Sequence, residues 1–292
     1  LFMHVTLLGD FDALYFARVL KSVQHLLTVP RHVYLYVLGE KNQCRTLLEQ
    51  LPKTERTLFK QVCQIDKVSF SYHHKQHHMV VLTITKNNDY LLHDTKALQG
   101  LLLHELLHLE QMRKGMYKSI QQSYRKISTL YRKLLTHLHQ KRLIPILEHI
   151  GKDAVFLLKD LYTNSAMIER GYSHQLLRYY EHEFSFKKIC PRPVFYEHLK
   201  KAVEKEEKLL EIVFAFEFAL LSLILPFKKY KERHAKELLY YIERCYNLNM
   251  SELMRKCGPF TQFYLDHYSK PSKDFQEKYL HLIFTKVIEL LT

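Results

Sequence analysis

The chain has 292 residues, of which 47% are hydrophobic and 13% aromatic. This composition can fill a large core, which excludes a globally disordered protein and leaves room for one large domain or two ordinary ones. The formal net charge of +14 suits nucleic acid, acidic lipid or acidic protein as partners, although it says nothing of the fold. Charge without a clear cluster more often serves solubility, so nucleic-acid binding is kept only as an alternative.

Two features bear on the compartment. The longest apolar run, residues 212–227, is interrupted by Glu217 and is shorter than the ~20 residues that a membrane span needs, so we expect no span. The five cysteines are widely spaced and form no CxxC pair, which is typical of reduced thiols rather than of a disulfide framework. We therefore expect a cytoplasmic protein.

The first part of the chain alternates predicted helices and strands. Apolar residues at helical spacing predict a helix over 11–28, and a β-branched and aromatic run predicts a strand over 32–39. Asp94 or Thr95 is the expected N-cap of a helix that ends before Gly115. The other elements expected here are a helix over 41–51, strands over 67–73 and 79–86, and the capped helix itself over 94–114.

The patterns that follow residue 115 predict helices. The scarcity of glycine and proline, 7 and 8 residues in the whole chain, agrees with long helices and few tight turns. We therefore expect an α+β protein, with an α+β unit over 1–115 and a mostly α-helical region over 116–292. The helices expected in the second region cover 116–139, 143–150, 153–170, 172–184, 193–225, 230–247 and 274–291.

The stretch "LLLHELLHLEQ", residues 101–111, carries the chemistry. His104 and His108 are four residues apart, so that on a helix both rings lie on one face with Cβ atoms ~5–6 Å apart and can bind one metal ion. Glu105 lies about 100° round the helix, where it can reach a water molecule on that metal without being a ligand. Polar residues at the centre of a leucine-rich helix need partners of this kind, because their burial is otherwise costly.

In these residues the sequence resembles the zincin metallopeptidases, and among them the small gluzincin- or minigluzincin-like proteins of archaea and bacteria. The resemblance rests on His104, Glu105 and His108, on the strands before them, and on Gly115 at the end of the helix. It implies a small sheet, a backing helix and an active-site helix within 1–115, with zinc as cofactor. Lys114 stands where the metzincin pattern has a third histidine, so that subgroup is excluded.

A zinc site of this kind needs a third protein ligand. On the helix over 153–170, Asp160 shares a face with apolar residues and Asn164, and an acid on such a face needs a charge partner such as a metal. The gluzincin resemblance favours a glutamate, which Glu169 could supply, and His174 is a further alternative. We favour Asp160 as the third metal ligand, and we expect Asn164 to contact a metal ligand and fix its orientation without binding the metal itself. The other members of this face are Phe156, Leu157, Leu161, Met167 and Ile168.

Together these features predict a zinc-dependent metallopeptidase that acts on a peptide or protein substrate. His104 and His108 bind the metal, and Glu105 is the general base that takes a proton from the attacking water. Two alternatives stay open: a non-catalytic binding protein on a zincin scaffold, and a basic nucleic-acid-associated protein. The basic helix over 121–142, which also carries aromatic residues, is more simply a solvated face than a site for nucleic acid or acidic lipid.

Overall fold

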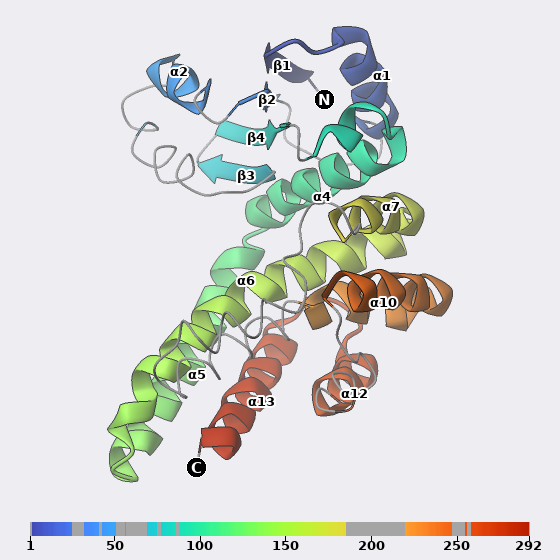
Figure 1. Ribbon diagram of the computed structural model, residues 1–292. Coiled ribbons are helices and arrows are strands. Elements are labelled where there is room, and N and C mark those ends of the chain that lie inside the picture. The colour runs from blue at the N-terminus through green and yellow to red at the C-terminus, as the bar shows by residue number, and fades with distance from the viewer. Residues whose placement is uncertain are drawn as a thin grey trace. The chain divides into compact units, whose positions relative to one another are not determined.

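A computed structural model describes residues 2–24, 32–40, 43–50, 56, 69–74, 77–85, 88–184, 220–246, 255 and 258–291. The fold class is α+β, as predicted: a small sheet in the N-terminal part is followed by a mostly helical region (Figure 1). The chain divides into two compact units, the first made of residues 1–114 and 174–182 and the second of residues 115–173 and 183–292.

The sheet of the first unit has four strands in the order β1-β2-β4-β3. Strands β1, β2 and β4 are parallel, and β3 pairs antiparallel with β4 at one edge. Consecutive residues Val80, Val81 and Leu82 are fully buried, so both faces of β4 are covered, as is usual for parallel strands. The strands span Phe2–Leu8 (β1), His32–Leu38 (β2), Ser69–His74 (β3) and His77–Thr83 (β4).

Helix α4 is the central helix of the first unit and contacts both α1 and β3. It is buried over most of its circumference, including every residue from Gly100 to Gln111, which explains why six of these twelve positions hold leucine. Of the two expected N-caps, Asp94 is the one used, since its Oδ1 accepts a hydrogen bond of 3.0 Å from the Ala97 amide. The other helices of the unit are α1 (Ala13–Gln24), α2 (Gln43–Gln50), the short η1 (Asp89–Leu92) and α7 (Ser173–Glu183); α4 spans Thr95–Arg113.

The second unit is helical wherever it forms regular structure within the described residues. Helix α13 packs against α5 and α6, and an aromatic cluster contains Tyr162, Tyr264, Tyr268 and Phe275. Burial of these rings contributes to the hydrophobic core of this unit, together with buried leucine and isoleucine side chains. The helices are α5 (Met116–His137), η2 (Lys141–Leu143), α6 (Ile144–Glu169), α10 (Glu232–Tyr246), α12 (Gly258–His267) and α13 (Lys273–Leu291), and residues 220–230 are helical as well.

Helix α6 corrects the sequence prediction. Two helices, over 143–150 and 153–170, were expected, whereas α6 runs unbroken from Ile144 to Glu169. Gly151 does not end a helix: a Cβ atom there would lie 2.5 Å from the Tyr124 ring and 2.7 Å from the Phe284 ring. The glycine therefore permits close packing of α6 against α5 and α13. Strand β1 and helix α12 were not predicted, and most of the helix expected over 193–225 lies outside the described residues.

Two further expectations can be compared with the structure. None of the described helices is both long and apolar enough to cross a membrane. Cys245, however, is disulfide-bonded. The expectation of reduced thiols is therefore wrong for this residue, and the cytoplasmic expectation loses that support.

Candidate metal centre

The two histidines of the motif converge as their spacing predicts. The Nε2 atoms of His104 and His108 are 2.9 Å apart, and the two rings are nearly perpendicular, with an interplanar angle of 88°. Both side chains are largely buried, with exposed fractions of 9% and 8%. Two nitrogens bound to one tetrahedral zinc would be about 3.3 Å apart, so that a small change in the ring torsions suffices for joint coordination.

Asp160 is the third member of the group. The ligand atoms of His104, His108 and Asp160 all lie within 4.8 Å of one another, so the three could hold a metal ion. Across the described ranges, no other set of three or more His, Cys, Asp and Glu residues meets this condition. The group thus contains the acid that the sequence favoured as third ligand.

The donor set fits a divalent transition metal. Two imidazole nitrogens and one carboxylate oxygen are ligands that catalytic zinc sites use, with a fourth position left for water or substrate. Imidazole also binds copper, iron and nickel, so this set by itself does not identify the metal. One negative charge from Asp160 would partly neutralise a divalent cation in a partly buried site.

Glu105 is held from the sheet side. It is 6% exposed, and its Oε1 accepts a hydrogen bond of 2.6 Å from the Ser69 hydroxyl. Ser69 is the first residue of β3, the antiparallel edge strand. This serine was not identified from the sequence, because nothing local to either residue reveals a contact between residues 36 positions apart.

The other candidate residues lie elsewhere. Glu169, at the C-terminal end of α6, is exposed and accepts a hydrogen bond from the Tyr230 hydroxyl. Burial and the neighbouring Glu169 carboxylate raise the pKa of Tyr230, which keeps this phenol neutral and able to donate. Asn164 is completely buried, one helical turn after Asp160. Neither Glu169 nor His174 belongs to the group that could hold a metal ion.

The face of α6 that carries Asp160 is less uniform than expected. Phe156 is 58% exposed, and the Lys159 ammonium lies 4.6 Å from the centre of its ring. Asp160 itself is partly exposed. The four later members of the face are buried, so the apolar character on which the prediction rested holds for the C-terminal half only: Leu161, Asn164, Met167 and Ile168.

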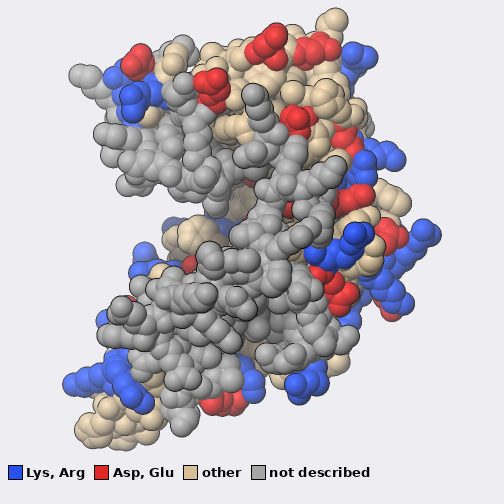
Figure 2. All heavy atoms as spheres, viewed as in Figure 1, with Lys and Arg blue, Asp and Glu red and all other residues tan. Residues whose placement is uncertain are grey.

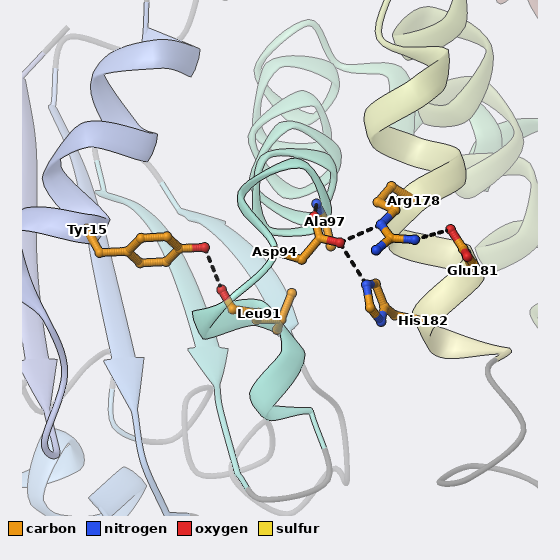
Figure 3. Close-up of polar contacts among 7 residues, drawn as sticks. All are labelled: Tyr15, Leu91, Asp94, Ala97, Arg178, Glu181 and His182. Carbon is orange, nitrogen blue, oxygen red and sulfur yellow. Dashed lines mark hydrogen bonds and ion pairs between the residues drawn. The ribbon is translucent and has the colours of Figure 1, made fainter.

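The N-terminus of α4 is fixed by a polar network, drawn in Figure 3. Besides capping the helix, Asp94 accepts hydrogen bonds through Oδ2 from Arg178 Nε at 2.5 Å and His182 Nε2 at 2.8 Å. Burial acts to raise the pKa of Asp94, but the hydrogen bonds from His182, Ala97 and Arg178 outweigh it and the net pKa is lowered. The His182 ring also stacks on Tyr90, with centroids 4.3 Å apart.

Helices α4 and α7 also approach each other closely at Gly100, one turn before His104. A Cβ atom at Gly100 would lie 2.2 Å from the Gln175 carbonyl oxygen and 3.1 Å from the Tyr179 Cβ. Only glycine fits at that separation. Helices α4 and α7 therefore meet in one defined register, which restricts the position of the histidine-bearing turn.

Comparison with known proteins gives no relative: no protein-family model, no curated protein and no solved structure matches the chain.

Proposed function

We propose that the protein is a zinc-dependent hydrolase that cleaves peptide bonds. The observation that carries the proposal is the convergence of His104, His108 and Asp160, beside a buried glutamate, Glu105, held by its own hydrogen-bond donor. A site for metal storage or for structural metal has no need of that glutamate. Its burial next to two ligand positions favours a role in proton transfer.

Each residue then has a defined role. His104 and His108 donate their Nε2 lone pairs, and Asp160 adds a carboxylate oxygen. A bound zinc ion would act as a Lewis acid on the substrate carbonyl and on a water molecule. Glu105 accepts the proton of the attacking water and can return it to the leaving amine, while Ser69 fixes the orientation of its carboxylate.

The choice of peptides as substrate rests on the resemblance to the zincins. The parallel strands, the antiparallel edge strand β3 and the following helix α4 with its HExxH motif are consistent with that fold. The proposed third ligand departs from the gluzincin pattern, because Asp160, and not Glu169, belongs to the group that could hold a metal ion. The proposed enzyme would therefore be a zincin with an aspartate as third ligand.

Metal content and activity, measured on the same variants, test the proposal. The purified protein should retain one zinc per chain, and His104→Ala/His108→Ala should retain none. Glu105→Gln should keep its zinc and lose activity on a peptide library by ~10²–10⁴-fold, because the amide cannot accept a proton. His149→Ala removes an exposed histidine of α6 and is the matched control.

The outcomes separate the alternatives. Full zinc binding without any cleavage by the wild type would favour a binding protein on this scaffold. Equal zinc in the wild type and in the double histidine variant would overturn the metal site altogether. Retention of iron or copper instead of zinc would support a metal site at these residues but would contradict zinc-dependent hydrolysis.

A further inference from the structure

Helix α5, the short η2 and the start of α6 form a helical hairpin, and the surface at the end of this hairpin has an unusual composition. Three large apolar side chains are exposed there, with exposed fractions of 54%, 43% and 51% for Leu130, Leu134 and Leu138. They occur at intervals of four residues, so they share one side of the end of α5. Exposed leucines are ordinary singly, but an aligned set suggests a contact surface.

The same end of the hairpin is strongly basic. Residues 116–147 contain seven Lys and Arg residues and no Asp or Glu. Lys126 pairs with Glu277 and Arg132 with Glu148. Lys133, Lys141 and Arg142 are exposed, and within the described part of the chain no ion pair neutralises these three. Figure 2 shows Lys and Arg atoms beside uncharged atoms at this end of the hairpin, at lower left.

Leucines and cations belong to one surface. Leu130, Lys133, Leu134, His137 and Leu138 follow the spacing i, i+3, i+4, i+7 and i+8, which places them along one side of α5. Lys141 and Arg142 follow directly in η2. We call these seven residues the basic leucine tip. An apolar stripe flanked by lysine and arginine is the pattern of helices that lie in a membrane interface.

We propose that the basic leucine tip docks on the surface of an anionic lipid bilayer. The leucines would enter the boundary between headgroups and acyl chains, and Lys133, Lys141 and Arg142 would contact lipid phosphates and carboxylates. The proposal is independent of the metal site and adds a location to whatever reaction the protein performs.

Nucleic acid fits this surface less well. Single-stranded nucleic acid is bound by stacking its bases on exposed aromatic rings. The aromatic residues interleaved with the basic ones on α5 face inward instead: Tyr131 is 4% exposed and bonds to Thr285, and the Tyr124 hydroxyl donates to the Glu148 carbonyl. Exposed leucines would also gain nothing from a phosphate backbone.

A tryptophan reporter tests the contact directly, because the chain contains no tryptophan. Leu134→Trp is titrated with vesicles of phosphatidylcholine alone and of phosphatidylcholine with phosphatidylserine. We expect a blue shift of its emission, and quenching by brominated acyl chains, with the anionic vesicles only. Leu14→Trp, at an exposed leucine of α1, should show neither.

Charge and apolar contributions are then separated by co-sedimentation with the anionic vesicles. Lys133→Gln/Lys141→Gln/Arg142→Gln should lower partitioning by about 100-fold, given the contribution of each juxtamembrane cation. Lys21→Gln/Lys96→Gln/Lys270→Gln removes equal charge from other elements and should have a much smaller effect. Leu130→Ser/Leu138→Ser should lower partitioning by about tenfold.

Three results would overturn the proposal. The first is an emission shift of Leu134→Trp with neutral vesicles as large as with anionic ones. The second is no shift with either. The third is tight binding of duplex or single-stranded DNA that needs the three cations but is unchanged in Leu130→Ser/Leu138→Ser, since that would make the surface a nucleic-acid site. Circular dichroism confirms that each variant is folded, and all substituted residues are exposed.

Discussion

Ser69 and Glu105 join the edge strand of the sheet to α4, the helix of the candidate metal ligands His104 and His108, through a hydrogen bond of 2.6 Å. A carboxylate that rotates freely about its side-chain torsions spends part of its time turned away from a water molecule that it should deprotonate. The serine restrains one of its two oxygens and leaves the other for the reaction. Ser69 is thus a positioning residue in the proposed mechanism.

Ser69→Ala should lower the hydrolytic kcat by about tenfold with zinc content unchanged, because a hydrogen bond to a charged group is lost. Ser69→Thr keeps a hydroxyl and should restore most of the rate, which a merely structural role would not require. Ser71→Ala, two residues on along the same strand, is the matched control. Equal rates for Ser69→Ala and the wild type would remove Ser69 from the mechanism.

The third ligand can be decided between two acids of the same helix. Asp160→Ala should weaken zinc binding by at least about 100-fold, beyond the ~10–100-fold typical of an outer-shell partner. Glu169→Ala should leave zinc affinity unchanged and affect only the contact with Tyr230. Competition with a zinc chelator measures both. The reverse result, in which Glu169→Ala abolishes binding, would restore the gluzincin arrangement and remove Asp160 from the site.

The lowered pKa of Asp94 predicts that the stability of the protein depends on pH. Its pKa in the folded protein is lowered, so its contribution is fully present above the unfolded value of about 4 and is lost as the pH falls through the lower folded value. Asp94→Asn can still cap α4 but carries no charge. The free energy of unfolding should therefore be lower for Asp94→Asn than for wild type at neutral pH, and the difference should shrink below about pH 4.

Urea denaturation at several pH values measures this difference. Asp94→Ala, which removes the cap as well, should cost about 1–2 kcal/mol at neutral pH. A difference between wild type and Asp94→Asn that stays constant down to the acid limit would show that the charge of Asp94 contributes nothing.

The convergence of His104 and His108 could be predicted from the sequence, because the helix geometry that aligns the two residues depends only on their spacing. The N-cap at Asp94 was equally accessible, since capping is a local preference. Asp160 was favoured for a reason that is only half right: its face of α6 is buried from Leu161 onward, whereas Phe156 is exposed. Helical periodicity predicts which residues share a face, but not where the covering elements end.

Contacts between distant segments could not be predicted. Ser69 and Glu105 meet because β3 forms the edge of the sheet next to α4. The order of the strands in the sheet cannot be predicted from the sequence of either segment. Separate helices were predicted over 143–150 and 153–170, on either side of Gly151, a residue type that disfavours helix by about 1 kcal/mol. Its presence is explained only by the rings of Tyr124 and Phe284 that pack against it.

Gly100 determines how closely α7 packs on α4, the helix that carries His104 and His108. A methyl group there would lie 2.2 Å from the Gln175 carbonyl oxygen, and a backbone atom cannot yield as a flexible side chain does. Gly100→Ala should gain up to ~1 kcal/mol of helix propensity and still destabilise the protein by about 1–3 kcal/mol through overpacking. Gly258→Ala, at the start of α12, is the matched control, because among the described residues no atom beyond its chain neighbours and its own helix backbone lies within 4 Å of the position that its added methyl group would take. Thermal unfolding of both variants measures the effect; equal midpoints for Gly100→Ala and wild type would mean that α7 can move away from α4 without loss.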